Sequence, residues 1–208
     1  MTKLTPQNLL VEMLKHEKLD NFIQGEWIKD GKGCMWGCTM QSSEDAIEKA
    51  CERYQIPLWL GHLAEAIFEG LSTEYSKSWP VDCIRAFCSY EGDTKIIEHE
   101  LAILRLTPLA ENNPTAASSI NAVIDCHQKF IDGDLDIDWV NVRDAAKAVA
   151  ASSEACSAAL SADSAADSAK YSAEAVTYSA AYSAAWKIEA ENLLSILRNK
   201  EVSHDNVY

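Results

Sequence analysis

The chain has 208 residues, of which 48% are hydrophobic and 24% charged, a composition typical of a folded protein rather than a disordered one. It carries 18 Lys and Arg against 32 Asp and Glu, so its formal net charge is -14. Because nucleic acids and anionic membranes bind clusters of cations, this acidic balance argues against direct nucleic-acid binding and against a membrane surface. The few Gly and Pro residues do not extend beyond Gly133, and this composition favours helices.

The N-terminus and the cysteines bear on the compartment. The residues after Met1 contain no apolar stretch with a small-residue cleavage site, so we expect no signal peptide. The apolar stretches are far shorter than the ~20 residues that a membrane span requires. Seven cysteines, an odd number, favour reduced thiols in a chain without a secretory signal. The sequence therefore predicts a cytoplasmic protein.

Helix signals follow one another closely through the first 133 residues. Thr5 and Pro6 are typical of a helix start, because threonine caps a first turn and proline fits the first helical position. Apolar residues then recur at three- and four-residue spacing, the pattern of a helix with one buried face. The same signals predict helices after Ser42 and Ser43 as far as Pro57, over about 57–69 with Gly70 as the C-terminal cap, from Ser78 to Gly92, from Asp93 to Pro108, and after Pro114 as far as Gly133.

Residues 17–41 are ambiguous. Asp30 to Gly33 is typical of a turn, whereas the neighbourhoods of Trp27 and Trp36 fit short strands or irregular loop equally well. With six or seven helices in all, residues 1–133 fit an orthogonal helical bundle better than a sheet. The sequence therefore predicts an all-α fold that begins with a globular helical domain over residues 1–133.

Residues 134–208 form a second predicted region, rich in alanine and serine. Between Ala145 and Ala190 there are 19 Ala and 9 Ser, and larger apolar residues return every 11 positions, for example at Val149 and Leu160. Eleven residues span three turns of a nearly straight helix, so this repeat predicts a long helix with one constant face. Ser161 to Ser164 would be the turn of the alternative, a helical hairpin. Such a helix is a scaffold or, alternatively, an association surface that makes a homo-oligomer.

Two cysteines, Cys34 and Cys38, form the most conspicuous local motif. A structural zinc site needs four ligands, and no second cysteine pair lies at finger spacing, so we expect no metal and buried structural thiols instead. No glycine-rich phosphate loop or nucleophile elbow is present, so we name no catalytic residue and no cofactor. The alternative is a metal- or Cys/His-dependent enzyme built on Cys34, Cys38 and His62.

A row of polar side chains offers a candidate binding site. His62, Glu65 and Glu69 are spaced to lie along one face of a helix. Trp36 and Trp59 lie close by in the sequence, and aromatic rings beside a few polar groups are typical of ligand pockets and partner surfaces. We predict these five residues as the binding site. The alternative is that both tryptophans belong to the core and that the row is a solvated helix face.

Three stretches carry a resemblance. They are Ile56-Pro-Leu-Trp-Leu-Gly-His-Leu-Ala-Glu-Ala-Ile-Phe-Glu-Gly-Leu71 with the following Trp79-Pro80, the segment Lys32-Gly-Cys-Met-Trp-Gly-Cys38, and the entry from Gly133 to Trp139 into an Ala-rich helix that ends Ala-Trp-Lys-Ile-Glu-Ala-Glu-Asn-Leu-Leu. In these stretches the chain resembles an uncharacterised Ala-rich helical protein family of tailed phages and prophages. Some Ala-rich members are distantly similar to immunity proteins of toxin systems. The resemblance implies an accessory protein of a mobile element and no catalytic residue.

Together these observations predict a non-enzymatic binding protein. Its partner would be a host or competitor protein, or a small ligand that it sequesters, as in an inhibitor of host defence. If the gene belongs to a phage, the protein acts in the host cytoplasm. The two alternatives are the enzyme built on cysteine and histidine and a structural or assembly rod that uses the 11-residue repeat.

Overall fold

The computed structural model describes residues 3–42, 44–112, 114, 117–134, 136–139 and 171–199. Within these ranges the fold is all-α, as the sequence predicts, and the only extended pairings are two isolated bridges. Also within these ranges, no helix is long and apolar enough to cross a membrane. The chain divides into two compact units, one formed by residues 1–92 with 180–208 and the other by residues 93–179. The orthogonal packing and the domain boundary after Gly133 stay predictions.

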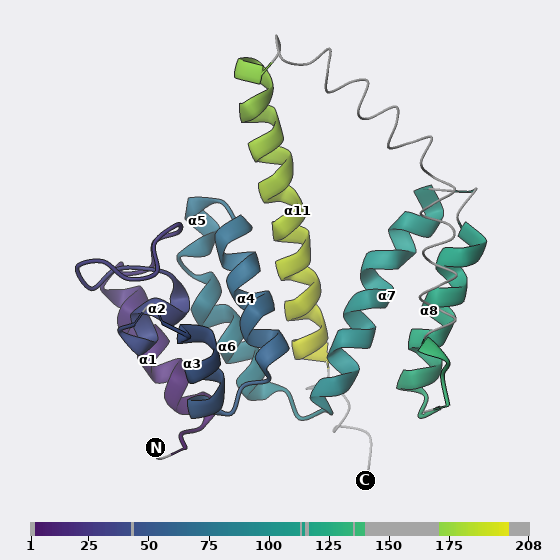
Figure 1. The fold of residues 1–208 in the computed structure, drawn as a ribbon, viewed down its shortest axis with the longest axis horizontal. Helices are drawn as coiled ribbons and strands as arrows, with labels where there is room; N and C mark the ends of the chain where they lie inside the picture. The colour runs from purple at the N-terminus through teal and green to yellow at the C-terminus, as the bar shows by residue number, and fades with distance from the viewer. Residues whose placement is uncertain are drawn as a thin grey trace. The chain divides into compact units, whose positions relative to one another are not determined.

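Six complete helices and part of a seventh make up the described part of the first unit. They are α1 (Pro6–Lys18), α2 (Met35–Met40), α3 (Ala46–Tyr54), α4 (Leu58–Gly70), α5 (Thr73–Ser76), α6 (Trp79–Ser89) and the part of α11 (Tyr171–Asn199) from residue 180 onward (Figure 1). Most of these helices contribute fully buried side chains to one core, and burial of each large apolar side chain stabilises the fold by about 1.5–3 kcal/mol. The largest are Leu9, Met13, Met35, Trp36, Tyr54, Leu60, Ile67, Phe68, Ile84, Leu193 and Leu197.

Helix α11 contacts the last residue of α4 and Tyr75 of α5 within this unit. A Cβ atom at Gly70 would collide with the indole ring of Trp186, so only glycine allows this approach. Beside it, Lys187 Nζ donates to the Tyr75 hydroxyl at 2.8 Å. Gly70 is the last residue of α4 and not the left-handed cap that its position in the sequence suggests. Glycine is required at this position because the Trp186 ring leaves no room for a Cβ atom, and not because of the backbone conformation.

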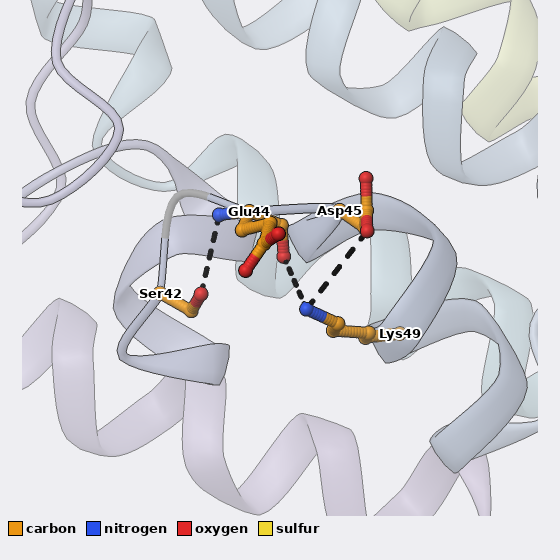
Figure 2. A network of polar contacts seen from close by, with 4 residues as sticks. All are labelled: Ser42, Glu44, Asp45 and Lys49. Carbon is orange, nitrogen blue, oxygen red and sulfur yellow. Dashed lines mark hydrogen bonds and ion pairs between the residues drawn. The ribbon is translucent and has the colours of Figure 1, made fainter.

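The start of α3 differs from the prediction. Asp45 is the residue before the helix, and its left-handed backbone has φ of 49°. Ser42 instead accepts a hydrogen bond from the Glu44 N–H at 3.2 Å, and Ser43 lies outside the described residues. Lys49 reaches back to donate to the Glu44 carbonyl at 2.8 Å, with its Nζ 4.0 Å from the Asp45 carboxylate (Figure 2). This exposed network therefore holds the turn into α3 where a serine cap was expected.

The described helices of the second unit are α7 (Thr94–Asn112) and α8 (Ala117–Ile131), which lie side by side (Figure 1), together with the first residues of α11. The prediction that α7 ends before Pro108 is wrong, because the helix continues through this residue. Proline removes the N–H that would bond the Leu104 carbonyl, but Leu104 is exposed and water can hydrate that group. The predicted end of α8 is confirmed, because Gly133 follows it with φ of +94°.

Most of the alanine- and serine-rich region lies outside the described residues. Residues 171–199 are helical, which agrees with the prediction for that part. Leu193, one position of the 11-residue series, is fully buried. The choice between one long helix and a hairpin at Ser161 to Ser164, and the association surface on this region, fall on residues that the structure does not describe.

Candidate functional site

The loop between α1 and α2 is tied to the end of α4. The Gln24 side-chain amide donates to the carbonyls of Phe68 at 2.6 Å and Leu71 at 2.8 Å, and more weakly to Glu69 at 3.2 Å. The last carbonyls of a helix have no partner within the helix, so this amide satisfies groups that would otherwise need water. The Gly25 N–H donates in turn to Glu69 Oε2 at 2.8 Å. These bonds place the loop beside the α4 face that carries Glu65 and Glu69.

The two cysteines hold the other side of the same loop. Cys34 caps α2, with its Sγ accepting from the Gly37 N–H at 3.3 Å. The Cys38 thiol donates to the carbonyls of Asn21 and Gly33, each at 3.4 Å. A Cβ atom at Gly37 would overlap the Trp27 carbonyl oxygen, so glycine lets the loop lie directly on α2. The segment that was ambiguous in sequence is thus a short helix with a loop bonded to it.

Burial keeps both thiols protonated at neutral pH. It raises the pKa of Cys38 to about 11 and the pKa of Cys34 further still. The nearby Glu65 charge raises the pKa of both thiols as well. Since the thiolate is the form that attacks substrates and binds metals, neither cysteine is an activated nucleophile or a ready metal ligand. These thiols support the loop.

A hollow of about 230 Å³ lies between this loop and α4. Three of its six lining residues are glutamates, and Trp27 beside them is 46% exposed. The lining residues are Gly25, Glu26, Trp27, Cys34, Glu65 and Glu69. All six belong to the first unit. The hollow therefore combines carboxylates with one aromatic surface.

Glu65 is the most unusual group in this hollow. Its Oε2 atom is buried and has no hydrogen-bond partner. Burial raises the pKa of Glu65 to about 7, the Cys34 thiol counteracts part of this rise by hydrogen bonding, and the Glu69 charge adds to it. A buried carboxylate oxygen without a donor is costly, because it has lost water and gained nothing in exchange. A ligand that brings a donor or a positive charge to Glu65 would remove that cost.

The structure separates the five predicted site residues. Glu65 and Glu69 line the hollow. Trp36 is fully buried and donates from Nε1 to the Gly61 carbonyl at 3.0 Å, so it belongs to the core. Trp59 is half-buried, and the exposed His62 has its Nε2 3.8 Å from Glu48 Oε1. Only the two carboxylates of the predicted row therefore meet in one cavity.

Sequence reasoning missed the loop side of the hollow. Gly25, Glu26 and Trp27 lie in the segment that was ambiguous between strand and loop, and nothing in their spacing points to α4. The one available signal was Gly25 between polar residues, which is typical of a tight loop. Its positive φ of 79° agrees with that signal. The contact to α4 depends on the Gln24 amide, whose partners lie 44 to 47 residues further along the chain.

Among the described residues, no group of three or more His, Cys, Asp or Glu side chains is arranged to hold a metal ion. Comparison with family models, with curated proteins and with solved structures gave no match. The resemblance to proteins of tailed phages and prophages therefore stays a prediction that rests on the stretches quoted for it.

Proposed function

We propose that this protein is a non-enzymatic binding protein, and that the hollow beside α4 takes a positively charged group from a protein partner or a small ligand. The observation that carries the proposal is the buried Glu65 Oε2 atom, which has no hydrogen-bond partner and belongs to a residue that lines the hollow. A bound ammonium or guanidinium group would supply that donor. It would also favour the charged form of Glu65.

The size and lining of the hollow suit one cationic group. A volume of about 230 Å³ is below the range of roughly 300–1,000 Å³ typical of pockets for drug-sized molecules, and it suits one side chain or a small amine. Glu26 and Glu69 add negative charge, while the exposed indole of Trp27 can attract a cation through its ring face. The net charge of -14 would speed the approach of a basic partner.

The biological setting of this proposal comes from the resemblance to phage and prophage proteins. In that setting, the protein acts in the host cytoplasm on a host or competitor protein, as an inhibitor of host defence does. A basic surface with a protruding Lys or Arg side chain is the partner chemistry that the hollow supports. The separate suggestion of an assembly rod depends on the alanine-rich region, most of which lies outside the described residues.

One observation favours a second candidate function. The pKa of Glu65, about 7, is near the value at which a carboxyl group transfers protons efficiently, so Glu65 would be the acid–base group of an enzyme. The enzyme built on Cys34, Cys38 and His62 has less support. Both thiols are held protonated, and His62 is next to Glu48.

Binding of simple cations tests the main proposal. We expect methylguanidinium or butylammonium to bind the full chain weakly in an NMR titration, with the largest shifts in residues 24–27 and 65–69. Glu65→Gln should weaken that binding about tenfold, because a hydrogen bond to a charged group contributes roughly 1.5–3 kcal/mol. Glu52→Gln is the matched control, since it removes one exposed carboxylate from α3 and should leave the affinity unchanged.

Two results would count against the cation site. One is shifts that spread evenly over the acidic surface. The other is an equal loss of affinity in both variants, which would reduce the binding to general charge attraction. Circular dichroism of each variant checks that the helices are intact.

A further inference from the structure

Two histidines meet in the second unit, away from the hollow described above. His99 of α7 and His127 of α8 have their Nδ1 atoms 2.8 Å apart. The His99 ring stacks on Phe130, with centroids 3.9 Å apart and planes at 21°. Trp139 lies against both imidazoles, at centroid distances of 5.6 Å and 5.1 Å. Both imidazoles are half-buried, so protons from solvent can reach them.

The short distance between the two nitrogens limits how many protons the pair can carry. One hydrogen must lie between the Nδ1 atoms, because one nitrogen donates and the other accepts. This condition holds when both rings are neutral, and it also holds when one ring is charged. When both rings are charged, each Nδ1 carries a hydrogen and none can accept. Two positive charges then face each other across a broken hydrogen bond.

We propose that the His99–His127 pair is a pH-operated latch between α7 and α8, closed while the two rings share a hydrogen and open once both are charged. Opening separates the imidazoles and loosens the stack with Phe130 and the contacts with Trp139. The device acts within the second unit and is independent of the cation site proposed for the hollow.

The neighbouring charges agree with a latch that acid opens. Burial lowers the pKa of His99 and outweighs the opposing charge of Glu98. Burial also lowers the pKa of His127, and a charge on His99 lowers it further. The other charged residues nearest in sequence on the elements that meet here are Lys95 and Glu100 on α7, Asp125 and Lys129 on α8, and Asp136 and Asp138 before Trp139.

The direction of the pH effect follows from these lowered pKa values. In the unfolded chain each imidazole titrates near its ordinary pKa of 6.5. Below that pH the open form binds more protons than the closed form, so acid favours opening. The contacts between α7 and α8 are therefore at full strength above about pH 7, and they weaken as the pH falls through 6.5 towards the lower pKa values of the folded pair.

Hydrogen exchange of the full chain at pH 7.5 and pH 5.0, corrected for intrinsic exchange rates, tests the latch. We expect amides of α7 and α8 to lose protection at pH 5.0. In His127→Gln, whose amide cannot take a charge, protection should be the same at both values. His62→Gln is the matched control, because it removes an exposed histidine of the first unit and should keep the loss at low pH. Equal protection at both pH values in the unchanged chain would overturn the proposal, as would a loss that persists in His127→Gln.

Proton NMR of the imidazoles in the unchanged chain keeps the test open if His127→Gln fails to fold. The proposal requires two coupled steps, with the second below the ordinary pKa, whereas two independent titrations near 6.5 would overturn it. All samples are measured again with a chelator. A pH response that disappears with the chelator would assign the pair to a metal ion instead and would also overturn the latch.

Discussion

The two compact units of this chain are held by different kinds of contact. The first unit has a core with large buried side chains such as Trp36 and Phe68, and its longest loop is tied down by bonds from Gln24 and Cys38 that are buried or half-buried. In the second unit, α8 has no buried side chain among the residues that the structure describes, and its clearest tie to α7 is a half-buried histidine pair. The first unit is stabilised by close packing of large side chains and by hydrogen bonds that water does not replace. The second depends on groups that solvent and protons can reach.

Glu65 in the first unit and the histidine pair in the second should therefore respond to pH in opposite directions. In the first unit the raised pKa of Glu65 means that the folded chain is destabilised as pH rises and this carboxyl group ionises. In the second unit the lowered pKa values of His99 and His127 mean that acid weakens the fold. One carboxyl group thus makes the first unit sensitive to rising pH, and one pair of imidazoles makes the second unit sensitive to acid.

The largest effect should come from Gly37→Ala. The new Cβ atom would overlap the Trp27 carbonyl oxygen, and a backbone atom cannot move aside as a flexible side chain does. We expect a loss of about 3 kcal/mol in the free energy of unfolding, because the loop must lift off α2. Thermal unfolding measures the loss, and Ser118→Ala on the exposed side of α8 should leave the melting temperature unchanged. A normal melting temperature for Gly37→Ala would show that the loop does not lie on α2.

The next effect concerns Glu65→Gln and depends on pH. An unfolded glutamate titrates near 4.5, whereas in the folded chain the pKa of Glu65 is about 7, so ionisation costs stability as pH rises between these values. The glutamine variant avoids this cost. At pH 8 it should be more stable than the unchanged chain by on the order of 2 kcal/mol, and the difference should shrink towards pH 5. Urea unfolding at the two pH values measures it.

The opposite trend, with the variant gaining stability only in acid, would mean that Glu65 is stabilised as a carboxylate. The cation proposal would then lose the unpartnered oxygen on which it rests. Glu52→Gln serves again as the control, because an exposed carboxylate on α3 should show no such pH dependence.

Helices were more predictable from this sequence than the site. Thr5, Pro6 and Gly133 mark helix ends through local backbone chemistry, and the structure has helix ends at these residues. The predictions at Pro108 and Gly70 are wrong for the same reason. Whether a proline ends a helix, and why a glycine is required, depends on neighbouring groups that the local sequence does not show. Leu104 is exposed, so water can hydrate the carbonyl that loses its donor at Pro108. Glycine is required at position 70 by Trp186, which lies 116 residues away along the chain.

The candidate site was half predictable. Glu65 and Glu69 share a helix face through simple spacing, and both line the hollow. The opposite wall could not be inferred, because Trp27 and Glu26 are placed beside α4 by hydrogen bonds that Gln24 and Gly25 make to residues more than 40 positions away. The sequence predicts Trp36 as a binding-site residue with the core as the alternative, because aromatic residues suit both pockets and cores. Its bond to the Gly61 carbonyl shows which of the two applies.

The smallest predicted effect compares two side chains that both bond backbone carbonyls within the first unit. Gln24 bonds three carbonyls at the end of α4, two of them in part-buried hydrogen bonds, whereas the bond of Lys49 to one carbonyl before α3 is exposed. Gln24→Ala should cost about 1–2 kcal/mol and speed hydrogen exchange in residues 21–33, since buried carbonyls would lose their donor. Lys49→Ala should cost roughly 0.5 kcal/mol or less, because water replaces its bonds and salt screens its charge. Equal losses in the free energy of unfolding for the two variants would mean that burial does not decide the strength of these contacts. The contrast between buried and solvent-exposed hydrogen bonds would then be wrong.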